Sequence, residues 1–387
     1  MKIVYILSSA TKYGGANKLF YHMLTSLIRK GVKPFVLLPE NGDMCEILFN
    51  DSIDFKVIPY YFTRYPPIRK GYELRDTLLY FLRLSKYIIV NFIAIEKIKK
   101  MLIKVNPDII HSNVGPVHIG FHAARKLHIP HVWHLQEYQK LDFDICPFPS
   151  MKSFIKKLNS KNNYCIVITK GIYKYFQLSD SNTRIIYDGA LNFNEKNFLS
   201  KKEKYFLFAG RLTHNKGVDN LINSFIEFSK LNKEYKLYIA GDTNDKKYND
   251  NLYQIVEKND LKERIVFLGM RDDIYELMEK ATALVVPSLF EGFGLITVEA
   301  MFNGCLVIGN NTAGTKEILE PENLGLLYTT NDELVKTMLE VVNKGIESYY
   351  PMILKSQKKA SELYSIEQNV DNVFNFYIEI VKAGHKK

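Results

Sequence analysis

Short runs of β-branched and other apolar residues recur along this chain between stretches of helical pattern, and this alternation limits the possible folds more than any other feature. Strands that alternate with helices pair in parallel, because each helix carries the chain back across the sheet. We therefore predict an α/β fold with doubly wound parallel sheets. The predicted strands are residues 2–7, 33–38, 55–58, 108–111, 130–134, 164–168, 184–187, 205–209, 236–240, 264–267, 282–287 and 305–308.

A polar segment over residues 189–204 shows neither the apolar spacing of a helix nor that of a strand, and it predicts the linker between two domains. At roughly 150 residues per domain, a chain of 387 residues has room for two to three domains. We expect one domain over residues 1–190 and a second over residues 191–365. Residues 366–387 are expected to form a helix that packs back on the first domain.

The composition excludes several classes of protein. With 47% hydrophobic and 24% charged residues, the chain lies far from the regime of disordered proteins. Its four cysteines form no C-x-x-C pair, which excludes a disulfide framework and a zinc ribbon and suits a reducing compartment. The apolar run at residues 3–7 is too short for a signal peptide. The longest uncharged stretch of the most apolar region, Tyr87 to Ile95, has nine residues. A bilayer needs about 20, so we expect no membrane-spanning helix.

The charge is unevenly distributed. Residues 1–199 hold 28 Lys and Arg against 15 Asp and Glu, and residues 200–387 hold 24 against 27. The resulting net charges of +13 and −3 predict that the first half faces an anionic partner. Residues 60–104 contain ten basic and three acidic residues, interleaved with aromatic ones. This pattern fits a helix lying on an anionic membrane surface and equally an amphipathic helix packed on the core. The chain carries no nucleic-acid-binding motif.

The first predicted strand runs into a loop that contains Gly14 and Gly15, directly before a helical pattern. Backbone N–H groups at such a helix start can contact an anion. A tight turn between strand and helix explains the two glycines equally well, because the G-x-G-x-x-G spacing of a dinucleotide site is absent.

A second loop of this kind follows the predicted strand 205–209 and reads GRLTHNKG over residues 210–217. It places Arg211 and Lys216 at the carboxyl end of a strand, beside a helix start. A pyrophosphate there would meet a guanidinium, an ammonium and backbone donors together. The alternative interpretation is a pair of solvated loop cations.

The segment with the most candidate functional residues reads PSLFEGFGLITVEA over residues 287–300. Glu291 lies in a glycine-containing turn, where its carboxylate can accept hydrogen bonds from sugar hydroxyls. A helix is predicted to begin near Gly294, so the N–H groups of Gly294 and Leu295 point outward and Glu299 lies about one turn further along, placed to hold a ribose diol. A capping acid and a surface acid are the alternative, but the glycine turn and the preceding strand favour a functional site.

In the first half, His111 and His134 each end a predicted strand, and Glu137 follows the second. Adjacent parallel strands bring their carboxyl ends to one crevice, so both imidazoles are expected to reach a ligand there. A single histidine is more often structural, and we favour His134 over His111 as the functional one. The Asp142-Phe143-Asp144 triplet matches a metal-chelating D-x-D, but it sits in a proline-bearing loop away from the other motifs. We expect a solvated loop and no metal there.

The motifs together resemble a known family. A strand followed by G-R-L-x(3)-K-G and a helix, with E-G-F-G-L-x(3)-E about 80 residues later, resembles the retaining glycosyltransferases of family 4. The resemblance spans both halves and is most specific between residues 205 and 319. It implies the GT-B fold, in which two Rossmann-like domains face a central cleft and the C-terminal helix crosses back. It also implies that the first domain binds the acceptor and the second binds the nucleotide sugar.

The resemblance further implies roles for single residues. Arg211 and Lys216 would grip the diphosphate, Glu291 would contact the donor sugar and His134 would lie near the reacting centre. We expect catalysis to depend on these four. The remaining residues expected to contact the donor are Gly14, Gly15, Gly269, Arg271, Gly292, Phe293, Gly294, Leu295 and Glu299. No metal and no cofactor is implied. Asp188 departs from the pattern, because the family often has Asn there.

The implied function is that of a retaining hexosyltransferase, which moves a sugar from a nucleotide diphosphate sugar, expected to be a UDP-sugar, to a glycan acceptor. We expect a lipid-linked acceptor in cell-surface polysaccharide biosynthesis, and a cytoplasmic enzyme held peripherally on the inner face of the cell membrane. No nucleic acid is expected as a partner. Two alternatives stay open: a sugar-nucleotide epimerase of the same fold, and a catalytically silent partner subunit of a glycosyltransferase complex.

Overall fold

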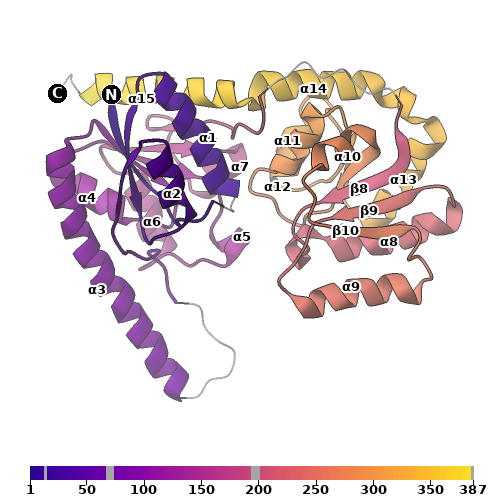
Figure 1. The fold of residues 1–387 in the computed structure, drawn as a ribbon, viewed down its shortest axis with the longest axis horizontal. Coiled ribbons are helices and arrows are strands. Elements are labelled where there is room, and N and C mark those ends of the chain that lie inside the picture. Colours follow the sequence, from indigo (N-terminus) through magenta and orange to yellow (C-terminus); the bar gives the residue numbers. More distant parts are fainter. Residues whose placement is uncertain (13–14, 67–73, 193–200, 385–387) are drawn as a thin grey trace. The chain divides into compact units, whose positions relative to one another are not determined.

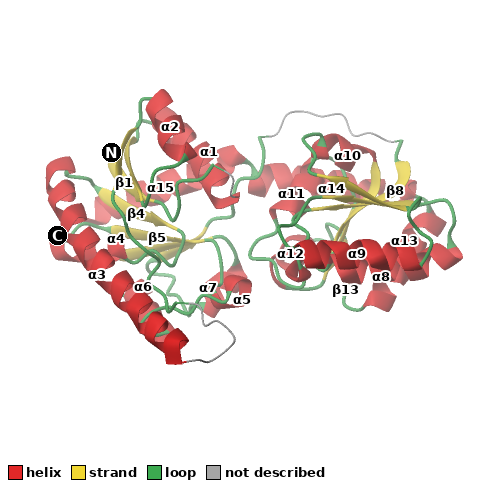
Figure 2. Ribbon diagram, turned by 60° about the horizontal axis from the view of Figure 1, so that its bottom comes forward, coloured by secondary structure: helices red, strands yellow, loops and turns green. Residues whose placement is uncertain are grey.

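The computed structural model describes residues 1–12, 15–66, 74–192 and 201–384. The chain forms two compact units, each considered by itself (Figure 1). Unit 1 comprises Met1–Gly189 and Ile366–Lys387, and unit 2 comprises Ala190–Ser365. Each contains one parallel sheet with helices on its two faces (Figure 2), so the predicted doubly wound α/β fold is confirmed. Most of the predicted linker, residues 193–200, lies outside the described residues.

The sheet of unit 1 has seven parallel strands in the order β3-β2-β1-β4-β5-β6-β7. The strand order reverses between β1 and β4, because the chain proceeds outward from β1 in one direction and from β4 in the other. The strands are β1 (Lys2–Ile6), β2 (Lys33–Leu38), β3 (Asp54–Val57), β4 (Ile109–Asn113), β5 (His131–Leu135), β6 (Asn163–Val167) and β7 (Thr183–Ile185).

Helices cover the two faces of this sheet, as alternate residues of β1 show. Ile3 and Tyr5 pack in a core with α1, α2 and α15, whereas Val4 and Ile6 pack in a core with α3 and α4. All four side chains are fully buried, which explains the continuous apolar run in the sequence. The helices are α1 (Gly15–Arg29), α2 (Asp43–Asn50), α3 (Leu74–Val105), α4 (Ile119–Leu127), α5 (Lys140–Phe143), α6 (Met151–Leu158), α7 (Lys170–Tyr175) and α15 (Ile366–Gly384).

The sheet of unit 2 has six parallel strands in the order β10-β9-β8-β11-β12-β13, and its order reverses between β8 and β11. The strands are β8 (Glu203–Ala209), β9 (Lys236–Ala240), β10 (Ile265–Gly269), β11 (Ala281–Val286), β12 (Val307–Asn310) and β13 (Leu326–Tyr328). The helices are η1 (His214–Lys216), α8 (Val218–Leu231), α9 (Lys246–Lys258), α10 (Ile274–Lys280), α11 (Leu295–Phe302), α12 (Ala313–Leu319), α13 (Asn331–Lys344), η2 (Ile346–Tyr349) and α14 (Tyr350–Tyr364).

Every predicted strand is present, with its ends within two residues of the predicted ones. The sequence reasoning missed β13, which has only three residues, Leu326–Tyr328. It pairs on one side only, with β12, at the edge of the sheet. Its apolar run, Leu326 to Tyr328, has three residues, one fewer than the predicted run at residues 184–187 that corresponds to β7, and a run this short does not distinguish a strand from a loop.

The long helix α3 extends beyond the sheet of its unit (Figure 1). Over Thr77–Val105 it is long and apolar enough to cross a membrane, judged by length and composition alone, and 11% of its most apolar window is buried. The sequence argument did not detect this helix, because it counted only the uncharged run Tyr87 to Ile95, whereas an apolar helix of spanning length can include isolated charges. That no helix of the chain spans a membrane stays a prediction. Large exposed apolar side chains on α3 are Leu78, Leu79, Phe81, Leu82, Ile88, Ile89, Phe92, Ile93 and Ile103.

Candidate active site

The reversal of strand order in unit 2 brings two of the sequence motifs to one edge of the sheet. Ligands of open α/β sheets bind outside the carboxyl ends of the strands at such a point. Arg211 and Lys216 follow β8, and Glu291 follows β11, the neighbouring strand. The edge therefore gathers cations and a carboxylate that are far apart in the sequence.

Lys216 and Glu291 form an ion pair at this edge, in which the ammonium group donates to Glu291 Oε1. The Ser288 hydroxyl donates to the same oxygen at 2.7 Å. The side chain of Glu291 is 11% exposed and that of Lys216 is 27% exposed, so a ligand can still reach the pair. The Arg211 side chain is exposed, and no carboxylate in the described part of the chain pairs with it. One cation of the edge is therefore neutralised, and the other is available to an anion.

Gly217 holds Lys216 in place over the loop that carries Glu291. Its φ of +65° lies in the left-handed region, and a Cβ built on it would lie 2.1 Å from the carbonyl oxygen of Pro287. The two loops also join through their backbones, because the Leu289 amide donates to the Asn215 carbonyl at 2.9 Å. Only glycine satisfies both the backbone conformation and this close approach.

Helix α11 begins next to this pair. Its first residue is Leu295, and Gly294 precedes it with a φ of +103°, which confirms the predicted helix start. No side chain in the described part of the chain caps the helix start, so its first N–H groups and the positive end of its dipole are available to an anion. Gly292 and Phe293 lie in the turn before the helix. The Phe293 ring is buried against Tyr364, so only its backbone can contact a ligand.

Glu299, on the second turn of α11, is oriented by a tyrosine. The Tyr275 hydroxyl on α10 donates to Glu299 Oε1 at 3.2 Å. Burial and the Glu299 carboxylate raise the pKa of Tyr275, so the hydroxyl stays protonated and keeps donating. Glu299 is thereby held as a hydrogen-bond acceptor, the role that contact with a ribose diol requires.

Gly269 and Arg271, expected near the base of the donor, lie at the end of β10. The Gly241 amide, which follows β9, donates to the Gly269 carbonyl at 2.8 Å. The exposed Arg271 guanidinium forms a two-point ion pair with Asp273, with Nε 2.8 Å from Asp273 Oδ1. Since β10 is two strands from β8, this group shares the sheet edge but is separated from the Lys216–Glu291 pair.

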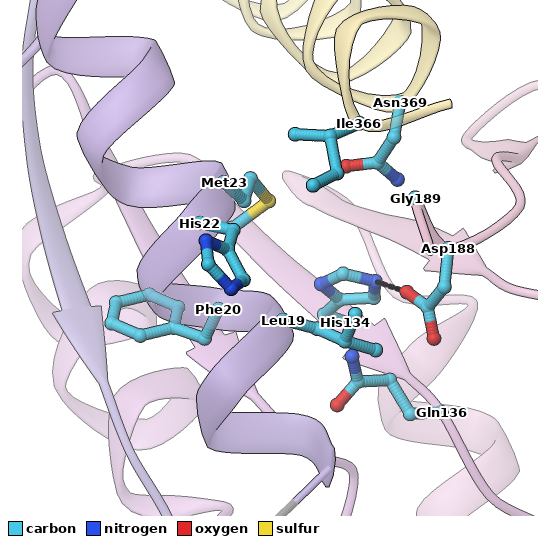
Figure 3. A pocket seen from close by; sticks show the side chains of 10 residues that line it. All are labelled: Leu19, Phe20, His22, Met23, His134, Gln136, Asp188, Gly189, Ile366 and Asn369. Atoms are coloured by element: carbon cyan, nitrogen blue, oxygen red, sulfur yellow. Dashed lines mark ion pairs between the residues drawn. The ribbon is translucent and has the colours of Figure 1, made fainter. Parts of the chain in front are cut away.

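His134 belongs to unit 1, where it lines a small pocket between α1 and α15 (Figure 3). In this view its ring lies between the side chains of α1 and the carboxylate of Asp188. His134 is 2% exposed, and neither of its ring nitrogens has a hydrogen-bond partner among the described residues. Its Nε2 lies 3.9 Å from Asp188 Oδ1, which is too far for a hydrogen bond. Two unpartnered nitrogens in a buried ring indicate that the partner is a ligand or a water.

Burial shifts both members of this pair toward their neutral forms. It lowers the pKa of His134 to about 4 and raises the pKa of Asp188 to about 7. Gln136 also lines the pocket, and its hydrogen bond to the Asp188 carboxylate moderates the shift. Near neutral pH the His134 ring is therefore uncharged and Asp188 is partly protonated, so the two do not form an ion pair.

His111 does not reach this pocket, which corrects the expectation that both imidazoles would meet a ligand. Its side chain is fully buried, and its Nδ1 lies 2.7 Å from the Tyr377 hydroxyl. Tyr377 belongs to α15, far away in the sequence. The rings of His111 and His134 pack edge to face, with centroids 5.3 Å apart. His111 thus supports the ring that faces the pocket.

The glycine loop at Gly14 and Gly15 and the Asp142-Phe143-Asp144 triplet are the remaining sequence features. Gly14 lies outside the described residues, and Gly15 is the first residue of α1. The Asp142 carboxylate accepts a hydrogen bond from the Tyr138 amide at 2.8 Å, and Asp142 lies in the short helix α5 rather than in an open loop. Within the described ranges, no group of three or more His, Cys, Asp or Glu side chains is arranged to hold a metal ion.

The sequence reasoning missed several residues of the unit 2 edge. Ser288 and Tyr275 orient the two glutamates, and nothing in the sequence pairs them with those partners. The hydroxyls of Thr297 and Thr315 are buried without a hydrogen-bond partner among the described residues, and they lie 3.4 and 3.7 Å from a Cβ built on Gly294. The signal that could have found them is their position in the first turns of two helices that follow neighbouring strands.

Comparison with known proteins gives a consistent result. Residues 191–359 match the family model described as glycosyl transferases group 1. An uncharacterized glycosyltransferase of Methanocaldococcus jannaschii is 27% identical over 372 residues, which cover 92% of this chain and 99% of that protein. A Campylobacter jejuni protein, named N-acetylgalactosamine-N,N'-diacetylbacillosaminyl-diphospho-undecaprenol 4-alpha-N-acetylgalactosaminyltransferase, is 26% identical over 54% of this chain and 57% of its own length. Among solved structures, Alr3699/HepE of Anabaena in complex with UDP superimposes with a TM-score of 0.78 at 20% identity, covering 97% of this chain and 99% of that one.

Proposed function

Because this chain is a glycosyltransferase of group 1 and has the GT-B fold, we propose that it moves a sugar from a nucleotide diphosphate sugar to a lipid-linked glycan acceptor, with retention of the anomeric configuration. The observation that supports binding of a nucleotide sugar is the edge of the unit 2 sheet. There the Lys216–Glu291 pair lies beside the uncapped start of α11 and the exposed Arg211. The UDP bound to the similar Anabaena protein supports uridine as the base.

The diphosphate of the donor is held by charges of the chain itself. The Arg211 guanidinium offers a planar fork to two phosphate oxygens, and Lys216 offers a point charge. The first N–H groups of α11 meet a third oxygen with the positive end of the helix dipole. Glu291 holds the Lys216 ammonium until the donor arrives and then accepts hydrogen bonds from the sugar. These groups suffice for binding, so we propose that no metal is required.

The same groups stabilise the transition state of transfer. The bond between the anomeric carbon and the diphosphate breaks, and the bond between the anomeric carbon and the acceptor oxygen forms on the same face of the sugar. The acceptor proton passes to an oxygen of the departing phosphate, so no protein base is needed. Negative charge grows on the diphosphate as its bond breaks, and preorganised cations and N–H groups stabilise that charge more than they stabilise the ground state.

His134 contributes a neutral polar contact to the donor sugar. With its pKa lowered to about 4, the imidazole is uncharged near neutral pH. An uncharged ring can hydrogen-bond to a sugar hydroxyl without repelling the positive charge that develops at the anomeric carbon. Its two unpartnered nitrogens provide one donor and one acceptor for this purpose.

The helix α3 supports a membrane-bound acceptor. Its exposed apolar side chains include Phe81, Leu82 and Ile89, each more than 45% exposed, and lysines follow toward its C-terminal end. Apolar side chains that enter the membrane interface and cations that meet anionic head groups together favour peripheral binding. We place the enzyme on the inner face of the cell membrane, in cell-surface polysaccharide biosynthesis.

The donor part is tested by incubating the purified protein with a panel of nucleotide sugars and measuring thermal stabilisation and released nucleotide. We expect UDP and one UDP-sugar to stabilise the protein, and Arg211→Ala to abolish the effect while leaving the unliganded melting temperature unchanged. A donor that is converted to its epimer without any acceptor would instead identify the chain as an epimerase. Equal stabilisation of wild type and Arg211→Ala would remove the phosphate role.

The membrane part is tested by flotation with vesicles that contain phosphatidylglycerol. The double variant Phe81→Ser/Leu82→Ser should lose about tenfold or more in vesicle affinity, because each side chain contributes roughly 1.5 kcal/mol or more when buried. Leu231→Ser is the matched control, since Leu231 is a 71% exposed apolar residue on unit 2. Equal capture of all three proteins would show that α3 does not bind the membrane.

A further inference from the structure

An apolar groove of about 410 Å³ lies in unit 1, and neither the donor site nor the His134 pocket uses it. One wall is α3, and the other walls come from α4, α6 and the segments around residues 62–64 and 148–149. The groove therefore lies beside the helix that we assign to the membrane.

The α3 wall of the groove is a continuous apolar stripe. Leu84, Ile88, Phe92 and Ile95 line it, at spacings of four and three residues that place them on one face of the helix. Ile119 of α4 lines the groove as well. Ile88 and Phe92 are 46% and 64% exposed, so this part of the stripe is not covered by the described residues of the unit. An apolar groove with this exposure suits a hydrocarbon chain.

Three cationic side chains line the same groove, those of Arg64, Lys126 and Lys157, and no Asp or Glu is among the described residues that do. His122 lines it as well, as a neutral imidazole. Lys126 pairs with Glu96, which lies outside the lining, at 3.0 Å. The groove therefore presents excess positive charge next to its apolar wall.

Lys157 contacts an imidazole rather than a carboxylate. Its Nζ lies 3.3 Å from Nδ1 of His118, a fully buried neutral ring stacked on Phe154. Burial lowers the pKa of Lys157, and burial together with the neighbouring Lys157, Arg125 and Lys126 charges lowers the pKa of His122 to about 4. A partly buried ammonium whose contact is an imidazole rather than a carboxylate is under-compensated, and an anion would restore the balance.

We propose that this groove binds the lipid diphosphate of the acceptor, with the hydrocarbon chain along the α3 stripe and the diphosphate on Lys157, Arg64 and His122. The inference rests on the proposed lipid-linked acceptor and names the part of it that the protein holds. The groove favours a single-chain lipid diphosphate over a bilayer phospholipid, because its one apolar stripe and its cluster of cations match one chain and a head group of high charge.

Farnesyl diphosphate is a suitable probe, with farnesol and inorganic pyrophosphate as its two halves, in calorimetric titrations without donor. We expect farnesyl diphosphate to bind at least tenfold more tightly than either half. Lys157→Gln should weaken its binding about tenfold or more, since hydrogen bonds to charged groups contribute roughly 1.5–3 kcal/mol. Lys156→Gln is the matched control, because Lys156 is an exposed neighbour on the same helix outside the groove.

A matched pair of variants on α3 tests the apolar wall of the groove. Ile88→Asn should weaken farnesyl diphosphate binding severalfold, whereas Ile93→Asn should not, because Ile93 is 48% exposed, close to the 46% of Ile88, but does not line the groove. Trp133 emission and melting temperature establish that each variant is folded. Equal binding by Lys157→Gln and Lys156→Gln would overturn the proposal. So would complete displacement of farnesyl diphosphate by phosphatidylglycerol vesicles, which would assign the groove to bulk lipid.

Titrations without donor keep this inference separate from the proposed function. Binding that follows the pattern above in a protein that transfers no sugar would preserve the site and refute the transferase. Transfer to a lipid-linked acceptor with unchanged KM in Lys157→Gln would preserve the transferase and refute the site.

Discussion

The carboxyl edges of the two sheets share a topology but differ in electrostatics. Both lie where the strand order reverses, between β1 and β4 in unit 1 and between β8 and β11 in unit 2. In unit 2 the reachable groups are charged, with Lys216 paired to Glu291 and Arg211 exposed. In unit 1, His134 and Asp188 are buried and shifted toward neutrality. The strand order places polar side chains at the carboxyl edge of each sheet, and the degree of burial decides whether those side chains are charged or neutral.

Hydrogen bonding explains why the unit 2 edge stays charged and the unit 1 edge is shifted toward neutrality. Glu291 receives bonds from Lys216 and Ser288 and keeps some exposure, so its charge is compensated. His134 lies 3.9 Å from Asp188 and has no hydrogen-bond partner among the described residues, so neither partner compensates for burial of the other's charge. The charged edge suits a diphosphate, and the neutral one suits a sugar near a developing cation.

Removing the charge from the unit 2 edge should have the largest effect. Lys216→Met takes away a phosphate contact and leaves Glu291 unpaired, so kcat/KM for the donor should fall by about 10²–10³-fold. Lys230→Met is the control, because Lys230 forms an exposed ion pair with Glu227 on α8. Glu291→Gln in the Lys216→Met background should restore stability but not activity. Comparable rates for the two lysine variants would place the phosphate site elsewhere.

The backbone that holds this edge should be the next most sensitive feature. Gly217→Ala adds a Cβ 2.1 Å from the Pro287 carbonyl in a left-handed conformation, and should lower the free energy of unfolding by on the order of 3 kcal/mol. Gly31→Ala has the same kind of φ, +86°, but meets nothing within 4 Å, so it should cost only about 1 kcal/mol. Calorimetric melting of the two variants measures the difference, and equal costs would mean that the loops are not in close contact.

Neutrality of the unit 1 pair predicts a pH dependence of stability. Between about pH 4 and 7 the folded state keeps the Asp188 proton that the unfolded chain has lost, so this group destabilises the fold as pH rises. His134 acts in the opposite direction, because below pH 6.5 the unfolded chain takes up a proton that the folded state refuses until about pH 4. The two contributions oppose each other across the same window in the wild type.

Asp188→Asn removes one of these contributions. The free energy of unfolding of the variant, relative to wild type, should therefore rise with pH between 4 and 7, by about 1 kcal/mol per pH unit. Urea unfolding followed by the fluorescence of Trp133, the one tryptophan of the chain and a buried residue of unit 1, measures this. Parallel pH profiles for the two proteins would show that Asp188 is ionised in the fold.

Chelation should have the smallest effect. Since cationic side chains and the α11 start would neutralise the diphosphate, EDTA should leave the transfer rate within about twofold of its untreated value. The rate is measured by release of UDP before and after dialysis against EDTA. A strict requirement for Mn²⁺ would show that protein charges alone do not balance the diphosphate.

Local patterns were enough to predict the fold but not its edges. Central strands such as β1 and β11 are apolar runs covered on both faces, as Ile3 to Ile6 show, and such runs are visible without any knowledge of their neighbours. The three-residue run of β13 is too short to be such a signal. For residues 60–104 the sequence left two interpretations open, an exposed membrane-surface helix and a helix packed on the core, because whether a helix is covered depends on elements elsewhere in the chain.

The candidate site was predictable where topology alone determines it. Residues that follow β8 and β11 meet because these strands are neighbours, so the approach of Lys216 to Glu291 follows from the motifs and the parallel sheet. The fate of His111 could not be predicted in the same way. His111 is hydrogen-bonded to the Tyr377 hydroxyl of the last helix, α15. The order of the strands does not predict that this helix packs against β4.

Sequence by itself determined the class of fold, which residues follow the carboxyl ends of the strands and hence the residue types gathered there, because these depend on periodicity and on the order of elements along the chain. Tertiary structure decided which of those residues are charged, which are covered and which still lack a partner. Those properties depend on desolvation by side chains that lie far away in the sequence, and the lowered pKa of His134 and the raised pKa of Asp188 have no signature in the residues around either one.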